Sequence, residues 1–214
     1  MKNWTHTERG ESHSKNEDYL VCQSHPGSNA NYLCFIADGQ GGRPNGALAS
    51  KIACQAGLEA ALSTPFEELQ SESRWTEIIC RSDMRVSSLA EGGLTTLIGL
   101  TVSEQGIFGA SVGDSMALVF DSDGELFVAT ESQKKSPPIG SSEAVPVAFF
   151  KSFGPSSLLT LMTDGVWKYA GVSKITAILS GVISQQSIPM IRSSAALQTG
   201  NLPDDFSIVL VSSH

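Results

Sequence analysis

The residue pattern predicts an α+β sandwich of mainly antiparallel sheets. Segments with helical spacing of apolar residues are grouped along the chain, as are short β-rich segments, and most links between the latter are of hairpin length. The chain has 214 residues, 41% of them hydrophobic, which is enough apolar material for a sizeable core. We therefore expect one domain spanning residues 1–214.

The first half of the chain reads as two strands followed by two helices. Strands are expected at Asp18–Gln23 and Tyr32–Ala37, joined by a loop rich in turn residues. Asn45–Leu62 has apolar residues at helical spacing. A second helix is expected to begin at Thr64, where Thr-Pro-Phe-Glu matches a capping box with proline at the first helical position, and to run towards Leu89.

The second half is dominated by short strands. The turn formed by residues 121–124 predicts a hairpin, and residues 132–142, which are polar and contain two prolines, predict a surface loop. Two helices are expected at Val172–Ile183 and Ile188–Leu197. The expected strands are Leu94–Val102, Gly106–Val112, Met116–Phe120, Glu125–Ala129, Leu158–Thr163 and Phe206–Val211.

Charge and composition exclude several classes of function. Fourteen Lys and Arg against 22 Asp and Glu give a net charge of −8, which argues against a nucleic-acid partner or an anionic membrane surface. The four cysteines form no CxxC pair, so we expect buried free thiols in a reducing cytosol. The four histidines show no zinc spacing. Because the chain has no long apolar run and no apolar start, we expect no membrane span, no secretory signal and a cytoplasmic location.

Acidic residues punctuate four of the predicted strands. Two apolar runs end in Asp38-Gly39 and Asp164-Gly165, and two strands are preceded by Glu17-Asp18 and Asp204-Asp205. If the first two strands run antiparallel to the second two, these carboxylates meet at one rim of the sheets. Carboxylates gathered in this way repel unless they are protonated or bridged by cations, and oxygen ligands suit Mg²⁺ or Mn²⁺. Asp-Gly after a strand is also ordinary turn chemistry, so the residues alone leave both interpretations open.

Five short motifs occur in order along the chain: Asn16-Glu17-Asp18, Ala37-Asp38-Gly39-Gln40-Gly41-Gly42, Gly113-Asp114-Ser115, Thr163-Asp164-Gly165-Val166-Trp167 and Asp204-Asp205-Phe206-Ser207. Together they resemble the motifs of the PP2C-type (PPM) family of metal-dependent protein Ser/Thr phosphatases, over about residues 8 to 211. Gly46, Ala49-Ser50 and Thr95-Thr96 also fit the family pattern. The resemblance implies a four-layer α-β-β-α sandwich, with helices on both sides of two mainly antiparallel sheets.

The resemblance also implies a metal centre with two Mn²⁺ or Mg²⁺ ions. Asp38 would bridge the ions, and the Gly39 carbonyl would bind one of them. Asp164 and Asp204 would complete the protein ligands of the other. In the family mechanism, a hydroxide bridging the two ions attacks phosphorus in line, and the metals neutralise charge on the phosphoryl oxygens.

The resemblance further implies a second sphere, a substrate and an assembly state. Glu17 and Asp18 would hold metal-bound water, and Asp114 would belong to a third metal site. The substrate would be phosphoserine or phosphothreonine on a protein, the target of a Ser/Thr kinase, and we expect the enzyme to be a monomer. The segment around 130–156 is shorter than the family's mobile flap region, which affects substrate selectivity more than chemistry.

Three positions depart from the family pattern. His13 stands where the family has a phosphate-clamping arginine, so it is either a substitute clamp or a solvated loop residue. Gln40 stands where some members have a histidine proposed as general acid. Glutamine cannot donate a proton at useful pH but can orient water or a phosphate oxygen. Lys168 stands where many members have a carboxylate of the third metal site, and it either repels a third cation or points to solvent.

These departures leave a rival function open. A catalytically weak or inactive module of the same fold could bind a partner without turnover, and His13, Gln40 and Lys168 favour that interpretation. The intact trio of Asp38, Asp164 and Asp204 opposes it. A third alternative, within the phosphatases, is a partner-switch enzyme that acts on one small phosphoprotein.

Overall fold

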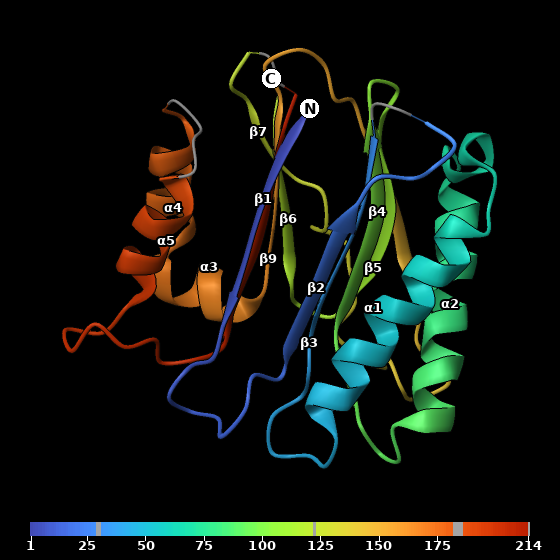
Figure 1. The fold of residues 1–214 in the computed structure, drawn as a ribbon, viewed down its shortest axis with the longest axis horizontal. Coiled ribbons are helices and arrows are strands. Elements are labelled where there is room, and N and C mark those ends of the chain that lie inside the picture. The colour runs from blue at the N-terminus through green and yellow to red at the C-terminus, as the bar shows by residue number, and fades with distance from the viewer. Residues whose placement is uncertain (29–30, 122, 182–185, 214) are drawn as a thin grey trace.

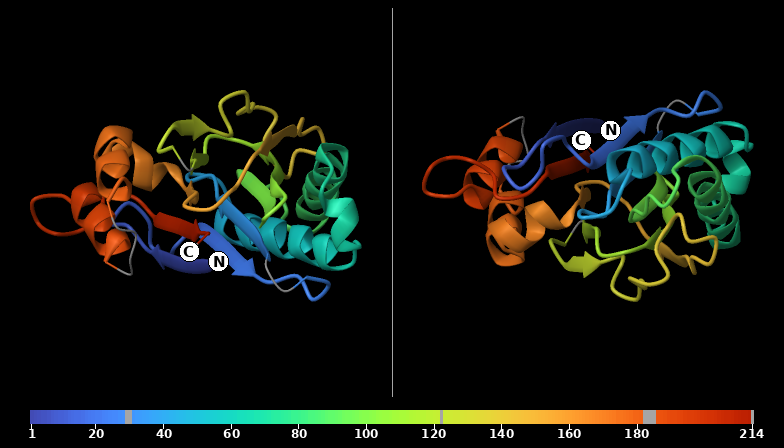
Figure 2. Two further views of the ribbon diagram at one scale, coloured as in Figure 1. Left: turned by 90° about the horizontal axis from the view of Figure 1, so that it is seen from above. Right: turned by 90° about the horizontal axis from the view of Figure 1, so that it is seen from below.

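Two β-sheets pack face to face between two groups of helices, as Figure 1 shows in a computed structural model. The structure describes residues 1–28, 31–121, 123–181 and 186–213. Seen from above and from below in Figure 2, the two groups of helices lie at opposite sides with the strands between them. The predicted α+β class and the four-layer α-β-β-α architecture are confirmed.

Each sheet has five strands, and every pairing within the described residues is antiparallel. The first sheet has the order β1 (Lys2–Glu8), β10 (Phe206–Ser212), β9 (Leu158–Met162), β6 (Met116–Phe120) and β7 (Leu126–Val128). The second has the order β2 (Asp18–Gln23), β3 (Asn31–Asp38), β4 (Leu97–Ser103), β5 (Gly106–Val112) and β8 (Val147–Lys151).

The helices cover the outer faces of the two sheets. Helices α1 (Gly46–Leu62) and α2 (Glu72–Leu89), with the 3₁₀ turn η1 (Phe66–Leu69), lie on the second sheet, whereas α3 (Asp164–Ala170), α4 (Val172–Leu179) and α5 (Ser187–Ala195) lie on the first (Figure 1). Three apolar clusters therefore fill the gaps between the four layers.

The three clusters follow from which face each strand side chain occupies. Phe35 and Ile36 are consecutive in β3 and both fully buried, because Phe35 packs against Trp75 of α2 while Ile36 faces the other sheet. Trp75 also donates its ring N–H to the Leu69 carbonyl at 2.8 Å, so its burial leaves no polar group unpaired.

Several expected elements differ from the observed ones. The capping box at Thr64 is wrong: its hydroxyl donates to the Ala60 carbonyl at 2.9 Å, and the segment forms η1 before α2 begins. Strands β1 and β8 and helix α3 were not expected, because most residues of β1 and β8 are exposed or half-buried and α3 is only seven residues long. The helix expected at Val172–Ile183 ends at Leu179 in the structure, and Ile183 lies outside the described residues.

The hairpin and the cysteines were predicted with mixed success. Strands β6 and β7 form the expected hairpin. All four thiols are free, but Cys80 is exposed on α2, which corrects the expectation that they are all buried. Within the described ranges, no helix is both long and apolar enough to cross a membrane.

Candidate functional site

The acidic residues that follow or precede the strands meet at one end of the sandwich, drawn at the bottom of Figure 1. Asp18 and Asp38 are direct partners in the antiparallel register of β2 and β3. Asp164 begins α3 immediately after β9, and Asp204 precedes β10, which is antiparallel to β9. The condition under which the carboxylates share a rim is therefore met.

Asp38, Asp164 and Asp204 line a cleft with a volume of about 580 Å³. Glu17 and Asp18 lie beside it, and neither is part of its lining. The cleft is also lined by two basic residues for which the sequence analysis predicted no role, Arg43 and Lys135. The lining residues that the sequence had singled out are His13, Asp38, Gly39, Gln40, Asp114, Asp164 and Asp204.

The backbone at Asp38 is fixed by two threonines that precede β4. The Asp38 amide donates to the Thr96 hydroxyl at 2.9 Å, and the Asp38 carbonyl accepts from the Thr95 hydroxyl at 2.8 Å and the Thr96 amide at 2.9 Å. A side chain at Gly39 would come within 2.4 Å of the Gly46 backbone. Glycine is therefore required there, and the carboxylate of Asp38 is held by a rigid frame.

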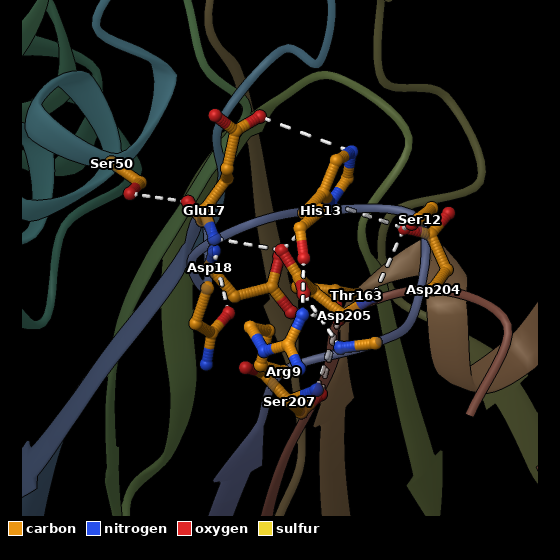
Figure 3. Close-up of polar contacts among 12 residues, drawn as sticks. Arg9, Ser12, His13, Glu17, Asp18, Ser50, Thr163, Asp204, Asp205 and Ser207 are labelled. Atoms are coloured by element: carbon orange, nitrogen blue, oxygen red, sulfur yellow. Dashed lines mark hydrogen bonds and ion pairs between the residues drawn. The ribbon is translucent and has the colours of Figure 1, made fainter. Parts of the chain in front are cut away.

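Asp205 connects the N-terminal loop to the start of β10. Its buried carboxylate accepts hydrogen bonds from the Gly10 amide (2.8 Å), the Glu17 amide (2.7 Å) and His13 Nδ1 (2.9 Å) (Figure 3). The sequence places Asp205 inside a motif but assigned it no role. Its position next to Asp204 could have revealed this role, because consecutive residues of an extended segment point to opposite sides. With Asp204 in the cleft, Asp205 is expected to face away from it.

Asp18 is buried behind the cleft and accepts a hydrogen bond from the Thr163 hydroxyl at 2.8 Å (Figure 3). Burial raises the pKa of its carboxyl group from 3.8 to about 7, and the charges of Asp205 and Asp164 act in the same direction. In addition, the Ser50 hydroxyl donates to the carbonyl of the neighbouring Glu17 at 2.6 Å. The Asn-Glu-Asp motif is thus held from both sides.

Burial and mutual repulsion also perturb the groups that face the cleft. Burial raises the pKa of Asp38 well above its usual range, reinforced by the charges of Asp18, Asp164 and Asp114. Such a set of carboxylates is unfavourable by itself, and a site that gathers it is a candidate for cation binding.

The pKa of His13 is also raised, but for histidine this shift favours the charged form. Burial alone would lower its pKa, but the hydrogen bond to Asp205 and the charges of Asp205, Asp204 and Glu17 outweigh burial and raise it. His13 Nδ1 is 3.6 Å from Asp204, and Nε2 is 4.0 Å from Glu17. The predicted phosphate ligand therefore lies in the cleft wall with Nδ1 already engaged.

Two lysines neutralise the carboxylates on the far side of the cleft. Lys168 donates a hydrogen bond to Asp164, which raises the lysine pKa, and its Nζ is 3.8 Å from Asp114. Lys135 Nζ donates to the same Asp114 carboxylate at 3.1 Å. Lys168 is 44% exposed, yet it does not simply point to solvent, because it lies between the two carboxylates.

The chemistry of the donor set fits hard divalent cations. Asp38, Asp164 and Asp204 offer only oxygen ligands, and the buried Glu17 Oε2 has no hydrogen-bond partner among the described residues. Within those same residues, however, no three acidic, cysteine or histidine side chains are close enough to form a preassembled cation site. The cleft therefore offers suitable oxygen ligands, but among the described residues these ligands are not preassembled around one cation position.

The four-layer sandwich is the fold of several bacterial phosphatases. The S. agalactiae serine/threonine phosphatase is 18% identical, with a TM-score of 0.81 over 100% of this chain and 99% of that one. The catalytic domain of PstP in complex with 2 manganese ions is 19% identical, with a TM-score of 0.80 over 99% and 97%. The Mycobacterium tuberculosis phosphatase PstP/Ppp is 18% identical, with a TM-score of 0.80 over 99% and 97%.

The sequence itself establishes the family. The family model described as protein phosphatase 2C matches residues 7–184, and the chain belongs to the protein phosphatase 2C family. It is a protein serine/threonine phosphatase. A search of the curated proteins found no significant match.

Proposed function

We propose that the chain hydrolyses phosphoserine and phosphothreonine on proteins with two Mn²⁺ or Mg²⁺ ions in the acidic cleft. The observation that carries this proposal is the meeting of Asp38, Asp164 and Asp204 in one cleft, from three segments far apart in the sequence. The PstP structure solved with two manganese ions has the same fold and supports the choice of metal.

In this proposal the ions are held by the Asp38, Asp164 and Asp204 carboxylates and the Gly39 carbonyl. When bound, divalent cations lower the pKa of coordinated water and offset negative charge on a phosphoryl group. The frame of Thr95 and Thr96 keeps Asp38 in place, which limits the reorganisation that catalysis requires.

Other residues beside the cleft would orient water or phosphate and limit the number of bound cations. Glu17, whose Oε2 makes no hydrogen bond to the described residues, and the buried Asp18 would accept hydrogen bonds from water beside the ions. Gln40 is exposed at the cleft and can orient water or a phosphate oxygen without supplying a proton. Lys168, placed between Asp164 and Asp114, disfavours a third cation because like charges repel at short range.

The proposed substrate is a phosphoprotein that a Ser/Thr kinase has modified, and the proposed enzyme is a cytoplasmic monomer with one domain. Residues 129–146 form the loop between β7 and β8. Since β8 is a strand of the second sheet, the proposed flap, expected around 130–156, is confined to that loop.

The function is tested by measuring hydrolysis of an aryl phosphate and of a phosphothreonine peptide in Mn²⁺, in Mg²⁺ and in EDTA. Hydrolysis should require added cation, and Asp38→Asn should abolish it while leaving the folded state intact. Calorimetry should show that Asp38→Asn also weakens Mn²⁺ binding, whereas the matched control Asp123→Asn, in an exposed turn, changes neither quantity. Full activity in EDTA or in the Asp38 variant would refute the mechanism.

The rival function, a module that binds a partner without turnover, is favoured by one observation. Lys168 already neutralises Asp164, as a cation would. The same experiment separates the two, since a pure binding module retains no cation-dependent hydrolysis of either substrate.

A further inference from the structure

Three basic side chains line the acidic cleft: His13, Arg43 and Lys135. We propose that Arg43 binds the phosphoryl group of the substrate. The inference rests on the proposed phosphatase function and names the residue that supplies a charged two-pronged donor to the phosphate.

Two of the three basic residues are already committed. His13 donates through Nδ1 to Asp205, which leaves only Nε2 for a ligand. Lys135 donates to Asp114 at 3.1 Å. Among the described residues, Arg43 makes no hydrogen bond, ion pair or ring contact, and it is exposed. Arg43 is therefore the lining cation whose donors are available.

The position of Arg43 allows it to reach a ligand in the cleft. It lies five residues after Asp38, in the connection between β3 and α1 that closes the lower end of the sandwich in Figure 1. Gly42, next to it, has a φ of +75°, and a side chain there would meet nothing within 4 Å. The loop around Arg43 is therefore open, and Arg43 itself lines the acidic cleft.

Charge balance requires a donor of this kind. A phosphate monoester is a dianion that must enter a cleft lined by four aspartates. Cations at the base of the cleft offset part of this repulsion, and the outer phosphoryl oxygens need hydrogen-bond donors as well. A guanidinium group stays charged at every working pH and matches two phosphoryl oxygens with parallel N–H bonds, which a lysine or histidine cannot do.

The test compares Arg43→Ala and Arg43→Lys with the matched control Arg81→Ala, which removes an equally exposed arginine on α2. At saturating Mn²⁺, Arg43→Ala should raise KM for an aryl phosphate and the inhibition constant of inorganic phosphate about tenfold, the effect of losing a hydrogen bond to a charged group. Changes in kcat should be smaller, Arg43→Lys should be intermediate, and Arg81→Ala should match the parent.

Two results would overturn the proposal. One is an unchanged KM and an unchanged phosphate inhibition constant in Arg43→Ala. The other is an increase in KM confined to the phosphothreonine peptide, which would place Arg43 against the peptide and away from the phosphoryl group. If the parent protein shows no hydrolysis, the proposed function fails instead. Calorimetric binding of inorganic phosphate to the Mn²⁺-loaded parent and Arg43→Ala proteins then still decides the role of Arg43.

Discussion

Asp18 lowers the stability of the metal-free protein at neutral and alkaline pH. The native state keeps a proton on this buried carboxyl group up to a pH of about 7, whereas the unfolded chain releases it near 3.8. Asp18 therefore costs no stability below pH 3.8. The cost grows as pH rises from 3.8 to about 7 and is complete above that pH, because folding then buries a charged carboxylate. The difference of about 3 between the two pKa values corresponds to roughly 4 kcal/mol at high pH.

Asp18→Asn should remove this penalty while retaining an acceptor for the Thr163 hydroxyl. Since a carboxylate accepts that bond more strongly than an amide does, the net gain in unfolding free energy at pH 8 in EDTA is about 2 to 3 kcal/mol. For a chain of this size, that gain raises Tm by roughly 4 to 12 °C.

The assay is thermal unfolding followed by circular dichroism at pH 8 and pH 5, with EDTA, for the parent, Asp18→Asn and the exposed control Asp123→Asn. At pH 5 the gain should fall to about zero, because only about 1.6 kcal/mol of the penalty remains there and the weaker bond to Thr163 offsets it. The control should match the parent at both pH values. Added Mn²⁺ should stabilise the parent more than Asp18→Asn. A variant no more stable than the parent at pH 8 in EDTA would refute the reasoning.

Lys168→Asp should raise Mn²⁺ affinity in calorimetry and turnover at high Mn²⁺, because a carboxylate replaces a cation at the metal ligands; an unchanged metal titration would show that this lysine does not influence the site. Glu8→Gln should lower stability by about 1 kcal/mol above pH 4.5, after allowance for exposure, since the bidentate bonds from Arg192 lower the Glu8 pKa to about 2 and their contribution is lost as pH falls towards that value. Equal melting of parent and variant at pH 7 would contradict this. Asp83→Ala should lower stability by about 2 to 3 kcal/mol and raise KM, because the buried Asp83 carboxylate accepts three hydrogen bonds from backbone amides of residues 140–144, next to the cleft wall. Asp83→Asn should restore part of the stability and part of the KM. An unchanged KM in Asp83→Ala would show that this loop does not influence the site.

The order of motifs was sufficient to predict the family and the layered fold. Asp38 ends β3 and Asp164 closely follows β9, so the antiparallel pairing of β2 with β3 and of β9 with β10 places Asp18 beside Asp38 and Asp204 at the same end as Asp164. The packing of the two sheets then brings both pairs to one rim. Strands β1 and β8 could not be predicted in the same way. Both are edge strands with mixed burial. The strand that pairs with β1 lies about 200 residues away in the sequence, and the one that pairs with β8 lies about 40 residues away.

The polar connections of the site were harder to predict than its carboxylates. Asp205 acts through the Gly10 and Glu17 amides, and backbone donors leave no mark on the residue sequence. Lys135 reaches Asp114 from a loop whose path depends on the distant Asp83. A sequence pattern therefore identified the ligands, whereas the residues that orient them required the fold.

The pairing of β1 with β10 has a consequence for the order in which the protein becomes active during synthesis. Strand β1 has β10 as its hydrogen-bonded neighbour in the sheet, and Asp204 and Asp205 immediately precede β10. A nascent chain on the ribosome thus has no partner for its first strand, no anchor for residues 10–17 and only part of the acidic cleft until β10 has emerged from the exit tunnel. Because Asp204 and Asp205 arrive only with β10, we expect a nascent chain in which β10 has not yet been made to have no phosphatase activity.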